Sequence, residues 1–500
     1  MGVRRRFARR QPPILEVIGR WADGPPPALP DDGPDDGRTI RWSAGALDGV
    51  MSRSGESPRE LARGAELAAL IENAATGDTD ARDELYEAAR ADGIVFALDE
   101  ALDGLALRHT DDDDVAELGR ALMREAQHRE PLKLAVALVG RTGDERDVPT
   151  VESLARHDEF SLVAGIALSH LLDDSVTAWW RVGCLAVGWG KIEAVGRLAQ
   201  EPELPEEVRA WLLRHGCDNA VMPEYLAHPC ATAGRLEEAV DGLVDDELLD
   251  GACTIVRALV NGGPAEDIDD YEPGPRVAAA VVELVGDRPP NLVRLDAVVD
   301  IRRWAEDYEQ HVALAERCGR VLTRADVRAF VADRLAEADE ALSVWTIAEA
   351  TGLDPWEAGW SHLQQADQDA GLYHELARTT NAERWERLTT FAERRLPLVA
   401  LASGPRDQLF PPPQQREAAR ALAVLVQGVR TDRWSVPLVA AALLSPVIST
   451  RNAALHALNR ATPEEWGELV RSALRRLAQE EPVAEVRARV REQLVRLGAS

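Results

Sequence analysis

From position 57 to the C-terminus, apolar residues recur at the three- and four-residue spacing of a helix, and no segment shows the sustained alternation of a strand. This pattern constrains the fold more than any other feature of the chain, and it predicts an all-α protein. Single hydrophobic cores stop growing at about 250–300 residues. Because the chain has 500 residues, we expect its helices to form an elongated array instead of one core.

The composition favours helices that approach one another closely. Hydrophobic residues make up 45% of the chain, which excludes global disorder, whereas aromatic residues make up only 5%. Most of the hydrophobic residues are Ala, Leu and Val, and Ala and Leu are typical of helix interiors. Small side chains at helix contacts suit stacked helices better than a β-sandwich.

The N-terminal part of the chain lies outside the predicted array. Residues 1–21 predict a basic arm and a short helix, and the arm is interpreted either as a frayed end or as a docking arm for an acidic partner. Residues 22–38 are rich in Pro, Gly and Asp and predict a linker. Residues 39–56 predict a cap or packed loop. Residues 57–500 predict helical repeats that become irregular from about 174 to 430.

Local signals place the individual helices. Ser57 and Pro58 are typical of a helix start, and this helix is expected to run to about Thr76. The carboxylates of Asp111–Asp114 are interpreted as complementing a helix dipole instead of binding calcium. The apolar face of the first helix is predicted to comprise Leu61, Ala65, Ala68, Leu70 and Ile71. In the irregular middle, helices are predicted at 176–187, 190–200, 206–215, 247–261, 276–285, 324–338, 355–366, 382–402 and 415–429.

Two segments carry repeat units. Residues 131–172 predict three helices, separated by a Gly-Arg-Thr-Gly-Asp turn and a His-Asp turn, with Pro149 in the first turn of the second helix. Near the C-terminus, Pro446-Val447 and Pro482-Val483 each open a turn-to-helix junction, 36 residues apart. The pairs Arg451 and Arg487, and Leu458 and Leu494, keep the same offset.

The pattern L-V-G-R-T-G-D-x-x-D-V-P-x-V-x-x-L at 138–154, with the helix that follows, resembles a HEAT repeat in its short bacterial form. This resemblance implies an α-solenoid of antiparallel helix pairs, a HEAT-like superhelix. Residues 188–227 also resemble a group of bacterial proteins labelled limonene hydroxylase. Because no haem-thiolate, flavin or iron motif accompanies that stretch, the second resemblance implies no mechanism.

The densest cluster of reactive groups is His215, Cys217, His228 and Cys230, whose H-x-C and H-x-C spacing offers weak candidate ligands for tetrahedral zinc. Residues i and i+2 of a helix point about 200° apart, which argues against convergence of each pair. We therefore expect no metal, with His215 ending a helix and the cysteines buried as apolar residues. A second alternative is a thiol nucleophile at either cysteine, with either histidine as its base.

Candidate partner-binding residues lie in the same region and just after it. Trp179 and Trp180 are adjacent and must point in different directions, so one of them can serve a partner. Glu224 and Tyr225 are further candidates. An acidic loop at 262–274, with Asp267, Asp269 and Asp270, lacks the spacing of a calcium loop and is interpreted as a docking site for a basic surface.

Net charge and missing motifs narrow the function. The chain has 57 basic and 86 acidic residues, a net charge of −29, which repels nucleic acid and anionic membranes and leaves solubility or a basic protein partner as explanations. An odd number of cysteines, five, and no secretory pattern predict a cytoplasmic protein. No cofactor motif is present. We expect a non-catalytic protein–protein interaction scaffold; the alternative is an enzyme or small-molecule-binding protein with its site at 179–230.

Overall fold

The computed structural model describes residues 11–22, 24–33, 42–51, 58–91, 93–108, 110–172, 174–337, 340–429 and 433–498. The predicted basic arm at 1–10 and the predicted helix cap at Ser57 lie outside these residues. Within them, all regular structure is helical except for one isolated bridge between Gln408 and Val447. None of the described helices is long and apolar enough to cross a membrane. The helical secondary structure confirms the all-α prediction.

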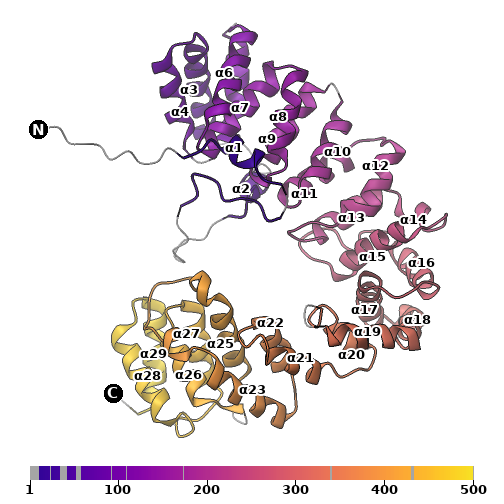
Figure 1. The fold of residues 1–500 in the computed structure, drawn as a ribbon, viewed down its shortest axis with the longest axis vertical. Coiled ribbons are helices and arrows are strands. Elements are labelled where there is room, and N and C mark those ends of the chain that lie inside the picture. Colours follow the sequence, from indigo (N-terminus) through magenta and orange to yellow (C-terminus); the bar gives the residue numbers. More distant parts are fainter. Residues whose placement is uncertain are drawn as a thin grey trace, which may run out of the picture. The chain divides into compact units, whose positions relative to one another are not determined.

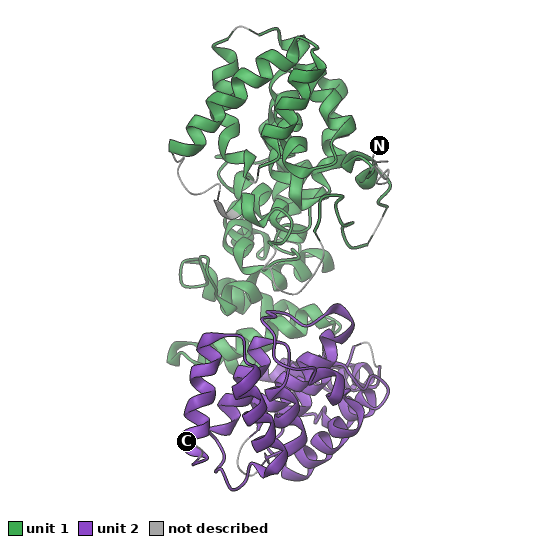
Figure 2. Ribbon diagram, turned by 90° about the vertical axis from the view of Figure 1, so that its left-hand side faces the viewer, with its two compact units in different colours: residues 1–33, 42–318 green, residues 34–41, 319–500 purple. Residues whose placement is uncertain are grey.

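The chain divides into two compact units (Figure 2). Of the described residues, unit 1 holds 11–33 and 42–318, and unit 2 holds 319–498. The division falls within α18 (Val312–Leu322). The helices of unit 1 before it are α1 (Ile14–Gly19), α2 (Ala46–Met51), α3 (Pro58–Ala75), α4 (Thr79–Ala89), α5 (Leu98–Ala106), α6 (Asp112–Glu125), α7 (Arg129–Thr142), α8 (Val148–Ala155), α9 (Asp158–Leu171), α10 (Ser175–Leu185), α11 (Trp189–Ala199), α12 (Glu206–Trp211), α13 (Glu224–Ala233), α14 (Leu236–Ala239), α15 (Asp246–Asn261), α16 (Gly274–Gly286) and α17 (Leu292–Glu306).

Unit 1 is built around a row in which every second helix contacts the next: α7, α9, α11, α13, α15 and α17 (Figure 1). Helices α6, α8 and α10 each pack against the row member that follows them in the chain. Glycines permit this close stacking. A Cβ on Gly140 of α7 would lie 2.6 Å from the Ala167 Cα of α9, and one on Gly251 of α15 would lie 2.1 Å from the Leu213 carbonyl oxygen. This packing of helices in sequence order is an α-solenoid, as predicted.

Unit 2 repeats the arrangement. One row runs from α22 through α25 and α27 to α29, and α26 contacts α28 in a second row. The helices α26 and α27 pair with each other, as do α28 and α29. The described helices after α18 are α19 (Ala325–Ala336), α20 (Trp345–Ala350), α21 (Trp356–Leu363), α22 (Ala370–Ala377), α23 (Ala382–Arg395), α24 (Leu398–Leu401), α25 (Arg416–Gly428), α26 (Val436–Leu443), α27 (Ile448–Leu458), α28 (Gly467–Glu480) and α29 (Ala484–Arg496).

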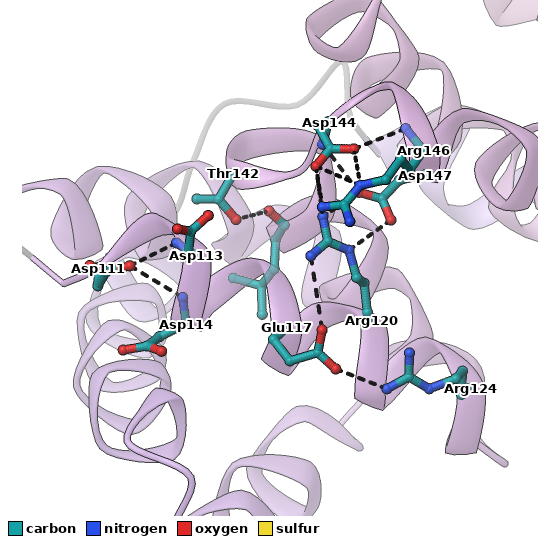
Figure 3. Close-up of polar contacts among 11 residues, drawn as sticks. Asp111, Asp113, Asp114, Glu117, Arg120, Arg124, Thr142, Asp144, Arg146 and Asp147 are labelled. Carbon is teal, nitrogen blue, oxygen red and sulfur yellow. Dashed lines mark hydrogen bonds and ion pairs between the residues drawn. The ribbon is translucent and has the colours of Figure 1, made fainter.

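The Gly-Asp turn between α7 and α8 shows why its residues are spaced as they are (Figure 3). The Asp144 side chain accepts from the Arg146 N–H at 2.9 Å, and the Asp147 side chain accepts from the Asp144 N–H at 3.1 Å. Arg120 of α6 then donates two hydrogen bonds of 2.9 Å to the two carboxylate oxygens of Asp147. The two aspartates close the turn on itself, and the arginine fastens it to the preceding helix.

Two further sequence expectations concern helix starts and faces. Asp111 accepts from the backbone N–H groups of Asp113 and Asp114 at 2.9 and 3.4 Å, so it caps the acidic first turn of α6. The apolar face predicted for α3 was right at Ala68 and Ile71, which are buried, and wrong at Leu61 and Ala65, which are exposed. The helix packs α5 closely at a glycine that the prediction left out. The buried residues of α3 are Gly64, Leu67, Ala68, Ile71 and Ala74.

The 36-residue offset in unit 2 is a structural repeat. The N-caps of α27 and α29, Val447 and Val483, have nearly equal backbone angles, with φ −87° and ψ 126° against φ −90° and ψ 124°. Arg451 Nη1 donates to the carbonyls of the two residues before its N-cap, at 2.9 Å each. Arg487 Nη1 makes the same two bonds at 2.7 and 2.9 Å. Each arginine therefore closes the turn that precedes its own helix.

The two arginines differ in their surroundings. Arg451 also forms a two-pronged ion pair with Glu481, at 2.7 and 2.8 Å, and both side chains are fully buried. Arg487 is only half-buried. Removing one partner of a buried ion pair leaves the other charge uncompensated, which is far more costly than losing hydrogen bonds at a wetter site.

We predict that Arg451→Leu destabilises the α27–α29 region by about 3–5 kcal/mol because Glu481 stays buried and unpaired. The matched change Arg487→Leu should cost about 1–2 kcal/mol. Hydrogen exchange of the α27 and α29 amides measures both effects. Equal losses for the two variants would contradict the assigned role of the buried pair.

Candidate functional site

A cleft of about 760 Å³ opens in unit 1. Its walls come from α11, the loop that follows it, α12, α13 and the acidic loop at 262–274. Most of it therefore falls within the irregular segment 179–230, together with residues just beyond it. The residues that line it are Gly196, Ala199, Gln200, Glu201, Pro202, Glu203, Leu204, Arg209, His228, Pro229, Thr232, Ala233, Arg235 and Glu266.

Helix α13 supplies one wall of the cleft. His228 and Thr232 are four residues apart and share a helix face, and Arg235 continues that face just after the helix ends. The His228 Nδ1 lies 2.8 Å from a Glu266 carboxylate oxygen, and the His228 ring packs edge-on against Tyr271 at 6.1 Å. The pair joins α13 to the acidic loop, two regions that the sequence analysis considered separately.

Arg235 holds an unusual backbone conformation at the cleft. Its φ of 57° is the only positive value of a non-glycine residue among those described. The preceding Gly234 cannot carry a side chain, because a Cβ there would lie 2.5 Å from the Cys230 carbonyl oxygen. A left-handed conformation costs a residue with a side chain roughly 1–2 kcal/mol. Such strain is commonly found at functional sites, which supports the choice of this cleft as the candidate site.

The unpaired charges of the cleft are negative. Arg209 pairs with Glu206 and also donates to the Leu204 carbonyl, and Arg235 lies 3.7 Å from Glu238. Glu201 and Glu203, in contrast, have no hydrogen bond or ion pair from their side chains within the described structure. The one ion-pair partner of Glu266 among the described residues is the His228 imidazole. The cleft therefore carries an excess of carboxylate charge.

The zinc candidates do not converge on one point. His215 is exposed and lies 3.4 Å from Glu247, whereas His228 pairs with Glu266. Cys217 and Cys230 are buried, and a π-helical turn at residues 212–216 brings Gly216 against the Cys230 sulfur. In the part of the chain that the structure describes, no group of three or more His, Cys, Asp or Glu residues is placed to hold a metal ion.

Burial also keeps the two thiols neutral. It raises the pKa of Cys230 to about 12 and holds the pKa of Cys217 well above its usual range. The Cys217 thiol donates weakly to the Pro223 carbonyl at 3.5 Å. Because the thiolate is the nucleophile and the metal ligand, neither cysteine is activated for either role at neutral pH.

The partner-binding candidates take different positions. Trp179 is buried, and its ring packs where a Cβ on Gly165 would otherwise lie; Trp180 is half-buried. Tyr225 is half-buried and packs against Trp189, with ring centres 5.7 Å apart. Glu224 is half-buried. Neither tryptophan therefore presents a fully exposed ring.

In the acidic loop, the Asp267 carboxylate accepts from the Asp269 N–H at 2.8 Å, and the Asp267 N–H donates to Asp270 at 3.1 Å. Asp269 and Asp270 are exposed. The loop is thus ordered by its own aspartates and presents two of them to solvent.

Sequence reasoning singled out His228 but missed its neighbours in the cleft. Thr232 and Arg235 could have been found from their spacing to His228 along one helix face. Glu266 reaches His228 only because α13 and the acidic loop pack together, and a local sequence pattern does not predict that packing. The charged residues and the threonine of the cleft that were not singled out before are Glu201, Glu203, Arg209, Thr232, Arg235 and Glu266.

We predict that, in the native protein at about pH 8, iodoacetamide labels the exposed Cys184 first. Burial raises the pKa of Cys184 as well, but its side chain is exposed, whereas Cys217 and Cys230 are buried and should react only after denaturation. Peptide mass spectrometry measures the order of labelling, and Cys184→Ser provides the control. Faster native labelling of Cys217 or Cys230 than of Cys184 would contradict the buried, neutral assignment.

Comparison with known proteins adds no assignment to this geometry. No protein-family model matches the chain. A search of curated proteins likewise finds no match. The residues of the cleft are therefore the basis for the function proposed below.

Proposed function

We propose that this protein is a non-catalytic interaction scaffold, a solenoid of the HEAT type, that binds a basic segment of a partner protein in the cleft of unit 1. One observation carries the proposal: Glu201, Glu203 and Glu266 line one cleft, and none of them has an arginine or lysine partner among the described residues. Lysine or arginine side chains of a partner would supply the missing positive charge.

The size of the cleft and the net charge of the chain fit this ligand. About 760 Å³ is within the range of clefts that enclose a small molecule or a few side chains. Opposite charges about 4 Å apart near a protein surface attract by about 4 kcal/mol before the cost of desolvation. The net charge of −29 would also speed encounters with a basic partner and disfavour nucleic acid.

The solenoid and the thiols support the rest of the proposal. Stacked helices give a rigid, extended surface without the need for a cofactor. All five cysteines are free, which fits a reducing compartment, and we assign the protein to the cytoplasm on that basis.

A small-molecule or enzymatic role of the same cleft is the second candidate, favoured by the His228–Glu266 pair. A carboxylate bonded to one imidazole nitrogen orients the ring and fixes which nitrogen faces a ligand. Within the described residues, however, His228 is not hydrogen-bonded to any hydroxyl or thiol that it could activate. This weighs towards binding instead of nucleophilic catalysis.

We predict that the triple change Glu201→Lys, Glu203→Lys and Glu266→Lys abolishes retention of basic partners from lysate, because it reverses the charge of the cleft. Quantitative mass spectrometry of proteins retained by immobilised full-length chain measures this, at low and at high salt. The control changes three exposed carboxylates elsewhere in unit 1 by the same charge: Asp83→Lys, Glu84→Lys and Asp103→Lys.

The expected result is a set of basic proteins that the wild type and the control retain and the cleft variant loses. Retention should also weaken as salt is raised. Circular dichroism checks that both variants keep their helices. A retained set that is the same for all three proteins would refute the cleft as the partner site.

A further inference from the structure

A second feature of unit 1 is a strap formed by residues 11–22, 24–33 and 42–51, which contains α1 and α2 and little other regular structure. Helix α1 contacts α6 and α8, and α2 contacts α9 and α11 (Figure 1). The strap is therefore not part of the helix stack. It lies across the stack and is held there by contacts distant in sequence.

Charged side chains make the central contacts. Arg129 at the start of α7 binds Asp31 through its backbone N–H and its Nε, at 2.8 and 3.1 Å, and also pairs with Asp32. Lys133, one turn further along α7, lies 2.6 Å from Asp48 of α2. The Lys133 side chain is only 2% exposed. Two cations of α7 thus hold three carboxylates of the strap.

The helices balance these cations even without the strap. Lys133 lies 3.0 Å from Glu130 and 2.7 Å from Glu159, and Arg129 lies 3.4 Å from Glu159. Two helix cations therefore already face two helix carboxylates, and the three from the strap are an excess. Burial raises the pKa of Asp48 against the opposing effect of Lys133.

A second set of contacts, from the end of α8 and the residue that follows, is made with backbone carbonyls of the strap instead of its side chains. Arg156 at the end of α8 donates to the carbonyls of Trp21 and Ala22, at 3.1 and 2.8 Å, and its guanidinium lies 5.0 Å from the centre of the Trp21 ring. The His157 Nε2 lies 3.4 Å from the Pro27 carbonyl oxygen. Proline has no N–H to satisfy, so carbonyl recognition suits a Pro-rich segment.

These contacts combine the two elements of a peptide-binding groove: main-chain recognition and pockets for particular side chains. A groove needed only for stability would be better filled by apolar residues, because buried ion pairs add little net stability. Few large apolar side chains of the strap are buried, chiefly Ile14, Ile18 and Leu29. Segments held by few apolar contacts open at low free-energy cost.

We propose that the face of α7–α9 bearing Arg129, Lys133, Arg156 and His157 is a binding groove for an acidic, proline-containing segment of a partner protein. The strap of this chain is its resident occupant. A partner segment of the same chemistry binds by displacing the strap. The stability of the bound strap therefore sets the affinity that such a partner needs. This groove is distinct from the acidic cleft and selects ligands of the opposite charge.

The test uses the full-length chain and a fluorescent peptide of residues 21–51. In the variant with Asp31→Lys, Asp32→Lys and Asp48→Lys, the weakened strap should leave the groove open, and the peptide should bind in trans. Wild-type chain should bind at least about tenfold more weakly, because a tethered occupant acts at an effective concentration on the order of millimolar. Fluorescence anisotropy measures both affinities.

Two controls make the outcome specific. A peptide with the three aspartates changed to asparagine should lose binding, and so should the full-length variant that combines the strap changes with Lys133→Met. If the lysine variant fails to keep its helices by circular dichroism, the milder pair Asp31→Asn and Asp32→Asn replaces it. Equal binding by the wild type and the strap variant, no binding by either, or equal binding of both peptides would overturn the proposal.

Discussion

Close contact between the backbones of neighbouring helical elements is the constraint on which unit 1 depends. At Gly140 and Gly251 the neighbouring backbone occupies the space that a side chain would need. Such contacts fix the distance between α7 and α9 and between the π-helical turn and α15. They therefore also fix where the loops between helices meet. The cleft exists because α13 is held in the row beside α11 and α15 while the acidic loop that follows α15 returns to contact His228.

The sequence predicted the parts of this fold that follow from local chemistry. The Gly-Asp turn and the two Pro-Val junctions are closed by residues within a few positions of each other, so their spacing was sufficient to find them. Helix α17 was missed because two of its buried residues, Arg294 and Asp300, are charged and interrupt the apolar pattern. Those charges are satisfied by residues of α15, Asp250 and Arg257, more than forty positions away in the chain. A sequence segment as long as one helix does not include these partners, so helical periodicity alone could not predict α17.

The candidate sites follow the same division. The spacing of His215, Cys217, His228 and Cys230 drew attention to a region that includes one wall of the cleft, but within the described residues the four side chains do not form a metal-binding group. His228 instead finds its partner in Glu266 of another loop. The buried position of Lys133 was equally hidden, since its carboxylates come from α2, α7 and α9. Local patterns identify residues with reactive chemistry, but tertiary packing decides which of them act together.

The strap has a consequence for the order of folding. Contacts within a solenoid join helices that are near in sequence, so the stack can grow as the chain is synthesised. The strap is different, because Arg129 lies 98 residues after Asp31, and Arg156 lies 135 residues after Trp21. The ribosome must complete α7 and α8 before the strap has a surface to bind. The strap is thus made before the groove that holds it, and it can be placed only once α7 and α8 are complete.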